Sequence, residues 1–163
     1  MSVRAAGWTT PVAALLLAAW LGAALYFTVV VTRAAFAVLP SRTLAGALVG
    51  QTLPVLFDTG MIVGVVLVAM ALLAPPGAAR STSLAGGVAI VALTALARFV
   101  ILTRIARLRA TMPAPIDSLS IDDPIRRAFG QLHALSVGAL GLAMLIGIVV
   151  VVVLAYSISA AHD

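Results

Sequence analysis

Four long apolar runs, each interrupted by no more than one charged residue, dominate this sequence. They cover residues of about 8–39, 44–73, 84–102 and 128–161. A helix needs about 20 apolar residues to cross the hydrocarbon core of a bilayer, and backbone in lipid must satisfy its own hydrogen bonds. A transmembrane barrel needs strands of alternating polarity, and these runs show none. The sequence therefore predicts an all-α integral membrane protein, a four-helix bundle that forms a single transmembrane domain over residues 1–163.

Composition excludes several other classes of protein. Apolar residues make up 63% of the chain and charged residues 9%, whereas soluble domains carry about 45–50% and about 25%. The sequence contains no Cys, which excludes disulfides, thiolate metal sites and a cysteine nucleophile. The net charge of +5 comes from arginines that flank the apolar runs, so a nucleic-acid partner is not expected. The Ala, Arg and Val bias without Lys is typical of a GC-rich bacterial genome.

The connections between the runs are short, with one exception. Residues 40–43 join the first pair of helices, and the Pro- and Gly-containing residues 74–83 join the second pair. The third connection, residues 103–127, is polar, and its first turns are expected to extend the third helix beyond the lipid. The prolines in residues 112–115 then break that helix. Asp122-Asp123-Pro124 has the pattern of a cap followed by proline in the first helical turn.

The distribution of arginine predicts the orientation in the membrane. The first and third connections and the helix ends beside them hold eight arginines, and the opposite side holds Arg4 and Arg80. The positive-inside rule then makes residues 103–127 a cytoplasmic loop and puts both termini outside. The expected setting is a bacterial cytoplasmic (inner) membrane, with the lipid bilayer and anionic lipid headgroups as partners. Trp8 and Tyr156 are expected near the outer interface.

The first apolar run has one alternative interpretation. Arg4 followed by an apolar stretch resembles a signal peptide, and Gly22-Ala23-Ala24 is a tolerable cleavage site. A signal core is about 7–15 residues long, and this run stays apolar far beyond Ala24. A retained transmembrane helix is favoured.

Small residues recur at four-residue spacing on three of the expected helices. These are Gly46 and Gly50, Gly60 and Gly64, Ala85 and Ala89, and Gly130, Ala134 and Gly138. Small residues let helix backbones approach closely in lipid. We expect them to pack the bundle internally, with a homo-oligomer or another membrane partner as the alternative.

Polar side chains within the apolar runs are the candidate functional residues. Asp58 is central in the second run, Arg98 and His133 lie in the inner halves of the third and fourth, and Arg33 lies near the end of the first. A charge at the bilayer centre costs about 2.5–3.5 kcal/mol on the insertion scale, so these four side chains are expected to converge. Gln51, two turns before Asp58, is a further candidate. The cluster is either a buried network that fixes helix register or a proton or anion site open to the cytoplasm.

The same residues give little sign of a metal, cofactor or catalytic site. Beside His133, the soft ligands within the runs are Met61, Met70 and Met144. Met144 lies 11 residues from His133, about 16 Å along one helix, and a copper site needs several converging ligands. No catalytic residue, no cofactor and no metal site is predicted, and the expected protein is not an enzyme.

Several short motifs resemble a known family. They are Phe36-x-x-Leu39-Pro40, Gly46, Phe57, Arg98, Arg104, and Arg127-x-Phe129-x-x-Leu132-His133-x-x-Ser136. Together they are similar to the transmembrane protein 205-like family, domain of unknown function 4149, within the CopD-like four-helix membrane proteins. The resemblance implies a four-helix architecture and adds Ser136 to the candidate residues.

The chain departs from the haem-handling relatives of this group at two places. Those relatives carry a His on the first helix, where this chain has Trp20-Leu21-Gly22. The branch often carries an Asn about a turn after the Ser, where Leu140 stands here. The favoured function is transport or sensing of a small ligand or ion through the polar cluster. The alternatives are a structural or assembly subunit of a membrane complex, and CopD-like copper or haem handling.

Overall fold

The computed structural model describes residues 3–112 and 115–160, which form helices joined by short connections. The first span is α1 (Val3–Tyr26), which continues through the π-helix η1 (Phe27–Val31) into α2 (Thr32–Val38). The second span is α3 (Arg42–Leu73). The third is α4 (Ala78–Ala95), continued by the π-helix η2 (Leu96–Ile101) and by α5 (Leu102–Ala110). A short 3-10 turn, η3 (Ile116–Ser118), lies in the connection to the fourth span, α6 (Pro124–Ser159). Four of these units are long and apolar enough to cross a membrane. The predicted all-α four-helix bundle is confirmed.

The ends of the helices agree with most of the sequence expectations. The third span continues without a break to Ala110, as expected. The Oδ1 atom of Asp123 accepts a hydrogen bond from the Ile125 amide at 2.7 Å, so the predicted cap of α6 is confirmed. Of the expected break over residues 112–115, Pro113 and Ala114 lie outside the described residues.

The connection after α3 is shorter than expected. We predicted that it would run to Ser83, but α4 begins at Ala78. The hydroxyl of Ser81 donates to the carbonyls of Gly77 and Ala78 at 3.3 and 3.1 Å, and the Ser81 amide donates to the Gly77 carbonyl at 3.1 Å as the first helical turn closes. Only the residues around Pro75 and Pro76 are non-helical, because two consecutive prolines cannot continue a helix.

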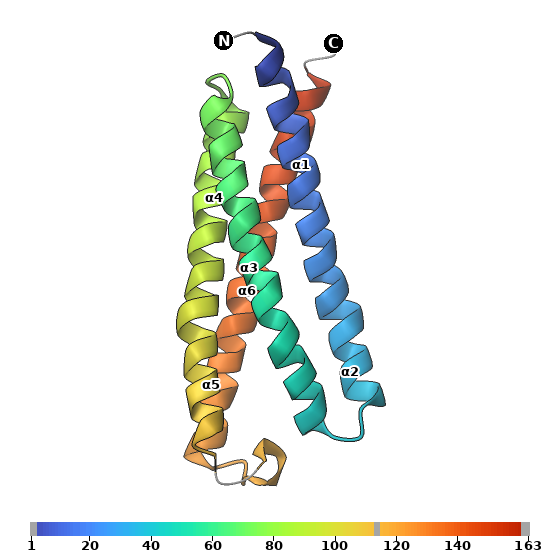
Figure 1. The fold of residues 1–163 in the computed structure, drawn as a ribbon, viewed down its shortest axis with the longest axis vertical. Helices are drawn as coiled ribbons and strands as arrows, with labels where there is room; N and C mark the ends of the chain where they lie inside the picture. Colours follow the sequence, from blue (N-terminus) through green and yellow to red (C-terminus); the bar gives the residue numbers. More distant parts are fainter. Residues whose placement is uncertain (1–2, 113–114, 161–163) are drawn as a thin grey trace.

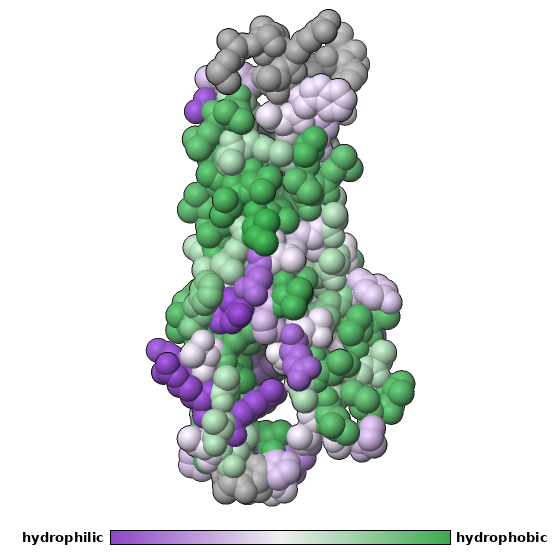
Figure 2. All heavy atoms as spheres, in the orientation of Figure 1, coloured by the Kyte–Doolittle hydropathy of each residue, from purple (hydrophilic) through white to green (hydrophobic). Residues whose placement is uncertain are grey.

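The helices run antiparallel, with the start of α1 and the end of α6 together at one end (Figure 1). Towards that end α1 packs against both α3 and α6. At the opposite end α2 stays with α3, while α5 and α6 stay together, and the two pairs diverge (Figure 1). Figure 2 shows that the half near the termini is almost continuously apolar, and that hydrophilic residues gather on the other half, where the surface is hollowed. Trp8 and Tyr156, which we expect near the outer interface, are both exposed.

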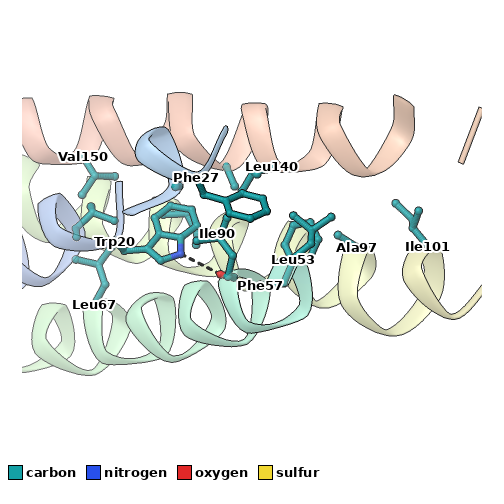
Figure 3. Packing of buried hydrophobic residues seen from close by; sticks show 14 of the residues in the cluster. Trp20, Phe27, Leu53, Phe57, Leu67, Ile90, Ala97, Ile101, Leu140 and Val150 are labelled. Carbon is teal, nitrogen blue, oxygen red and sulfur yellow. Dashed lines mark hydrogen bonds between the residues drawn. The ribbon is translucent and has the colours of Figure 1, made fainter. Parts of the chain in front are cut away.

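The core lies along the bundle axis and is filled by large apolar side chains. Phe57, Leu17, Leu67, Ile90 and Val150 are almost completely buried, and Figure 3 shows several of them between the helices.

Trp20 ties α1 to α3 within this core. Its indole Nε1 donates a hydrogen bond of 3.1 Å to the carbonyl of Leu56, drawn in Figure 3. The side chain is 4% exposed, so this bond satisfies a donor that burial would otherwise leave without a partner.

Close helix packing uses only some of the predicted small residues. Gly60 and Gly64 face α4 as expected, and a Cβ at Gly64 would lie 3.0 Å from the carbonyl oxygen of Gly87. On α4 the prediction was wrong: Ala85 is exposed, and the buried small residues are Gly86 and Gly87. The two positions after Ala85 face α6 and α3 because adjacent helical residues point about 100° apart.

The stripe on α6 is not used in packing among the residues that the structure describes. A Cβ added at Gly130 or Gly138 would meet no atom within 4 Å, and Ala134 between them is exposed. The expectation that this stripe packs the bundle internally is therefore wrong. The buried residues of α6 lie on another face of the helix and are Ser136, Leu140, Ala143, Gly147, Val150 and Leu154.

Candidate functional site

A cavity of about 1190 Å³ opens at the arginine-rich end of the bundle, between α2 and α3 on one side and α5 and α6 on the other. Its charged and titratable lining residues are Arg42, Arg98, Arg109, Arg126, Asp117 and His133. Ligand cavities commonly measure about 300–1,000 Å³. The cavity is therefore large enough to receive a ligand as well as water.

The charge of this cavity is strongly positive. Four arginines and a single carboxylate, that of Asp117, line it. Arg126 donates one hydrogen bond, from Nη1 to the carbonyl of Leu119 at 2.7 Å, which leaves its other N–H groups available. A guanidinium presents five donors in a planar fork that matches a carboxylate or a phosphate. The arrangement is suited to hold an anion.

Arg109 reaches from α5 across the cavity to α3. Its Nη2 donates to the carbonyl of Gly46 at 3.4 Å, and a Cβ added at Gly50 would lie 2.9 Å from its Nη1. On the other side, the guanidinium carbon lies 5.2 Å from the centre of the Phe129 ring of α6. The two glycines therefore make room for the guanidinium of Arg109, so they pack within the bundle against a side chain of α5 rather than against a helix backbone.

His133 continues this contact along α6. Its ring stacks on Phe129 with 6.3 Å between centroids and 2° between planes, so Arg109, Phe129 and His133 form a row. The imidazole is exposed to the cavity and donates or accepts no hydrogen bond within the described residues. Ser136 is 1% exposed, and its hydroxyl donates to the carbonyl of His133 at 2.8 Å. Ser136 also lines the cavity, so the two family-motif residues share one site.

Asp58 and Arg98 form an ion pair near the inner end of the cavity. Arg98 Nε donates to Asp58 Oδ1 at 2.9 Å, confirming the predicted approach of these two side chains. The side chains are 33% and 44% exposed for Arg98 and Asp58, so the pair is not sealed in the core. Arg98 lines the cavity, while Asp58 lies one helical turn beyond Pro54, which also lines it.

The π-helix η2 carries Arg98. π-helical turns are rare and occur frequently at functional sites, because they change the direction of side chains locally. A second π-helix, η1, precedes Thr32, whose hydroxyl donates to the carbonyl of Phe27 at 3.0 Å. Thr32 lines the cavity too. Both irregular turns therefore lie next to residues of this site.

Two of the predicted site residues do not join it. Arg33 is exposed and lies two residues before the buried Ala35, on the opposite face of α2. Gln51 is exposed in the same way, two residues before the buried Leu53. The expectation that Arg33 converges with the other charged groups is wrong, because its long side chain can extend along the outer surface instead.

Four site residues were not anticipated from the sequence. Arg42, Arg109 and Arg126 were interpreted as markers of membrane orientation, and Phe129 as part of a motif. The Gly46–Gly50 pair opposite Arg109 is the one sequence feature that points to this contact. It indicates that some group approaches α3 closely, but it does not identify Arg109 as that group. Among the described residues, no three His, Cys, Asp or Glu side chains converge in a way that could hold a metal ion.

Fold and site together define a multi-pass membrane protein with a basic cavity at one end. The family model for Domain of unknown function (DUF4149) matches residues 15–114, more than half of the sequence, so the chain belongs to that family. The match begins within α1, covers α3 and the third span, and ends before α6, where His133 and Ser136 lie. No curated protein and no solved structure matches the chain.

Proposed function

We propose that this protein binds an anionic ligand in its arginine-lined cavity and transports or senses it. The observation that carries the proposal is the convergence of Arg42, Arg98, Arg109 and Arg126 from α3, η2, α5 and α6 on one cavity with a single carboxylate. Of these arginines, Arg98 is neutralised by Asp58. The remaining charge favours an anion, because three further arginines face the cavity and Asp117 is the one carboxylate among the described residues that lines it.

The proposed setting is a bacterial inner membrane. The positive-inside rule places the arginine-rich end, and with it the mouth of the cavity, in the cytoplasm and both termini outside. The ligand would then enter from the cytoplasmic side.

Thermal stability of the purified protein tests anion binding. The probes are inorganic phosphate, sulfate and dodecyl phosphate, added in detergent solution. A ligand that binds only the folded state at 100 times its dissociation constant stabilises it by about 2.7 kcal/mol, so at least one probe is expected to raise the Tm by several degrees. The shift should disappear in the variant Arg109→Gln. It should persist in Arg107→Gln, because Arg107 is exposed on the same helix and does not line the cavity. Equal losses in both variants, or no shift with any probe, would contradict the proposal.

Uptake into proteoliposomes separates transport from sensing. Radiolabelled forms of the same three probes are offered to vesicles that contain the wild type or Asp58→Asn. If the cavity is part of a transport path, at least one probe accumulates, and Asp58→Asn slows its uptake at least tenfold because Arg98 loses its charged partner. Asp58→Asn removes the negative charge but keeps an oxygen that can accept from Arg98, so uptake that it leaves unchanged would exclude the charge of the ion pair from such a path.

The other functions expected from the sequence stay predictions. A structural or assembly subunit would use the Gly130–Gly138 stripe of α6, because a Cβ added at either glycine would meet no atom of the described residues within 4 Å. CopD-like copper or haem handling rests only on the family resemblance.

A further inference from the structure

We infer that the ligand is an anionic amphiphile, whose phosphate binds at the mouth of the cavity and whose hydrocarbon chain lies between α2 and α6. This inference rests on the proposed function and narrows it from any anion to a phosphate-bearing lipid. The phosphate of a lipid headgroup and free phosphate have the same chemistry, so the experiment must distinguish binding of the lipid from binding of free phosphate.

The cavity has a charged mouth and an apolar middle. Arg42, Arg109, Arg126 and Asp117 come from the ends of α3, α5 and α6 and from η3, all at the mouth. Further in, the lining consists mainly of apolar side chains such as Val49, Leu53, Leu102 and Ile105. A free phosphate would leave that middle zone in contact with water, whereas a hydrocarbon chain would cover it at a gain of about 0.8 kcal/mol per buried CH₂.

The length of the cavity suits part of a lipid chain. It extends along α6 from Arg126 to Ser136, which corresponds to about 15 Å at the helical rise. This is about half the thickness of a bilayer's hydrocarbon core. At the inner end Arg98 is already paired with Asp58, so that end presents no unpaired charge to the chain.

The cavity is also open on one side, towards the surface that faces lipid. At this end of the bundle α2 packs on α3 and makes no extensive contact with α6 (Figure 1). From α2 the cavity is lined by Phe36, which is 49% exposed. From α6 it is lined by Gly130, where an added Cβ would meet nothing within 4 Å. A lipid can therefore enter from the bilayer without leaving it.

Two arginines are placed to hold the phosphate. Arg109 makes one long hydrogen bond of 3.4 Å, and Arg126 makes one at 2.7 Å, so most of their N–H donors have no partner among the described residues. Arg42 donates no hydrogen bond within the part of the chain that the structure describes. Charge-assisted, bidentate bonds from arginine to phosphate are among the strongest hydrogen bonds in proteins.

Native mass spectrometry of the full-length protein, released from detergent, measures binding directly. The probes are phosphatidic acid, phosphatidylcholine, glycerol phosphate and inorganic phosphate at equal concentration. Phosphatidic acid should bind at least ten times more tightly than each of the others. The double variant Arg109→Gln/Arg126→Gln should weaken its binding at least tenfold. Its matched control is Arg104→Gln/Arg107→Gln, which removes two exposed charges of α5 outside the cavity and should change affinity less than twofold.

A second pair of variants tests the side opening. Gly130→Leu places a side chain in the cavity wall and should reduce binding of phosphatidic acid at least fivefold. Gly138→Leu makes the same change two turns further along α6, outside the cavity, and should have no effect. Neither position has a neighbour within 4 Å of the added Cβ, so both variants should fold.

Each result decides between the two levels of the proposal. If glycerol phosphate or inorganic phosphate binds as tightly as phosphatidic acid and depends on Arg109 and Arg126, the amphiphile inference is overturned and anion binding stands. If no phosphate-bearing probe binds, both are overturned. If Arg104→Gln/Arg107→Gln weakens lipid binding as much as the cavity variants do, the lipid adsorbs to the basic surface and the inference is also overturned.

Discussion

Replacing Asp58 by Ala is expected to lower the free energy of unfolding by at most about 2.5–3.5 kcal/mol, the cost of an unpaired charge at the centre of a membrane, because Arg98 is partly exposed to the cavity. In the wild type the carboxylate of Asp58 accepts from Arg98 Nε at 2.9 Å. Without it, the guanidinium lies within an apolar span with no carboxylate partner. Unfolding in mixed micelles with increasing amounts of sodium dodecyl sulfate measures this free energy.

The double variant Asp58→Ala/Arg98→Ala separates the ion pair from other effects. Removing both charges should recover most of the lost stability, because the large cost arises from one charge left alone. Asp122→Ala is the matched control, since Asp122 is exposed in the polar connection and should change stability by less than about 0.5 kcal/mol. If the double variant loses as much free energy of unfolding as Asp58→Ala and Arg98→Ala lose together, the two charges are not coupled.

A substitution at the close contact between α3 and α4 is expected to lower the free energy of unfolding by a similar amount. In Gly64→Ala the new Cβ would lie 2.7 Å from Val91 Cγ2 and 3.0 Å from the carbonyl oxygen of Gly87. The second atom belongs to the backbone, so the helices must separate, and overpacking of this kind costs about 1–3 kcal/mol. The same unfolding titration measures the loss.

Gly138→Ala supplies the control for this substitution. It adds the same methyl group to a helix, but with nothing within 4 Å of the added Cβ. Replacing Gly by Ala within a helix is otherwise favourable by about 0.5–1 kcal/mol, so Gly138→Ala should be neutral or stabilising. If Gly64→Ala and Gly138→Ala have the same stability, the close approach of α3 and α4 is not as the structure shows it.

The spans were predictable because length and hydropathy alone determine which segments can cross a bilayer. The approach of Asp58 and Arg98 was predictable for a related reason, since opposite charges within lipid lower their cost by pairing. Neither inference requires knowledge of how the helices are rotated or placed relative to one another. The end of the connection before Ala78 was missed because alanine and serine occur equally well in a loop and in a first helical turn.

The cavity was not predictable because it depends on which faces of the helices meet. Arg109 was expected to mark orientation outside the lipid, and only the packing of α5 shows that its side chain reaches α3. Arg33 was expected inside from its position along the span, but its face of α2 points outward. The two π-helices were also beyond prediction, since a single inserted residue in a turn leaves no mark in the hydropathy pattern.

The central claim, that the arginine-lined cavity admits water and favours anions, is tested most directly by thiol labelling. The sequence contains no Cys, so single-cysteine variants report one position each. Ala106→Cys lies in the cavity wall. Ala110→Cys is exposed one turn further along the same helix but outside the cavity, and Leu96→Cys lies on the apolar outer surface.

The protein is placed in nanodiscs and treated with membrane-impermeant reagents of equal size, one anionic and one cationic. We predict that Ala106→Cys reacts with both, that its preference for the anionic reagent is at least fivefold greater than that of Ala110→Cys, and that Leu96→Cys does not react. Failure of Ala106→Cys to react, or faster reaction with the cationic reagent, would contradict the existence of an anion-binding cavity.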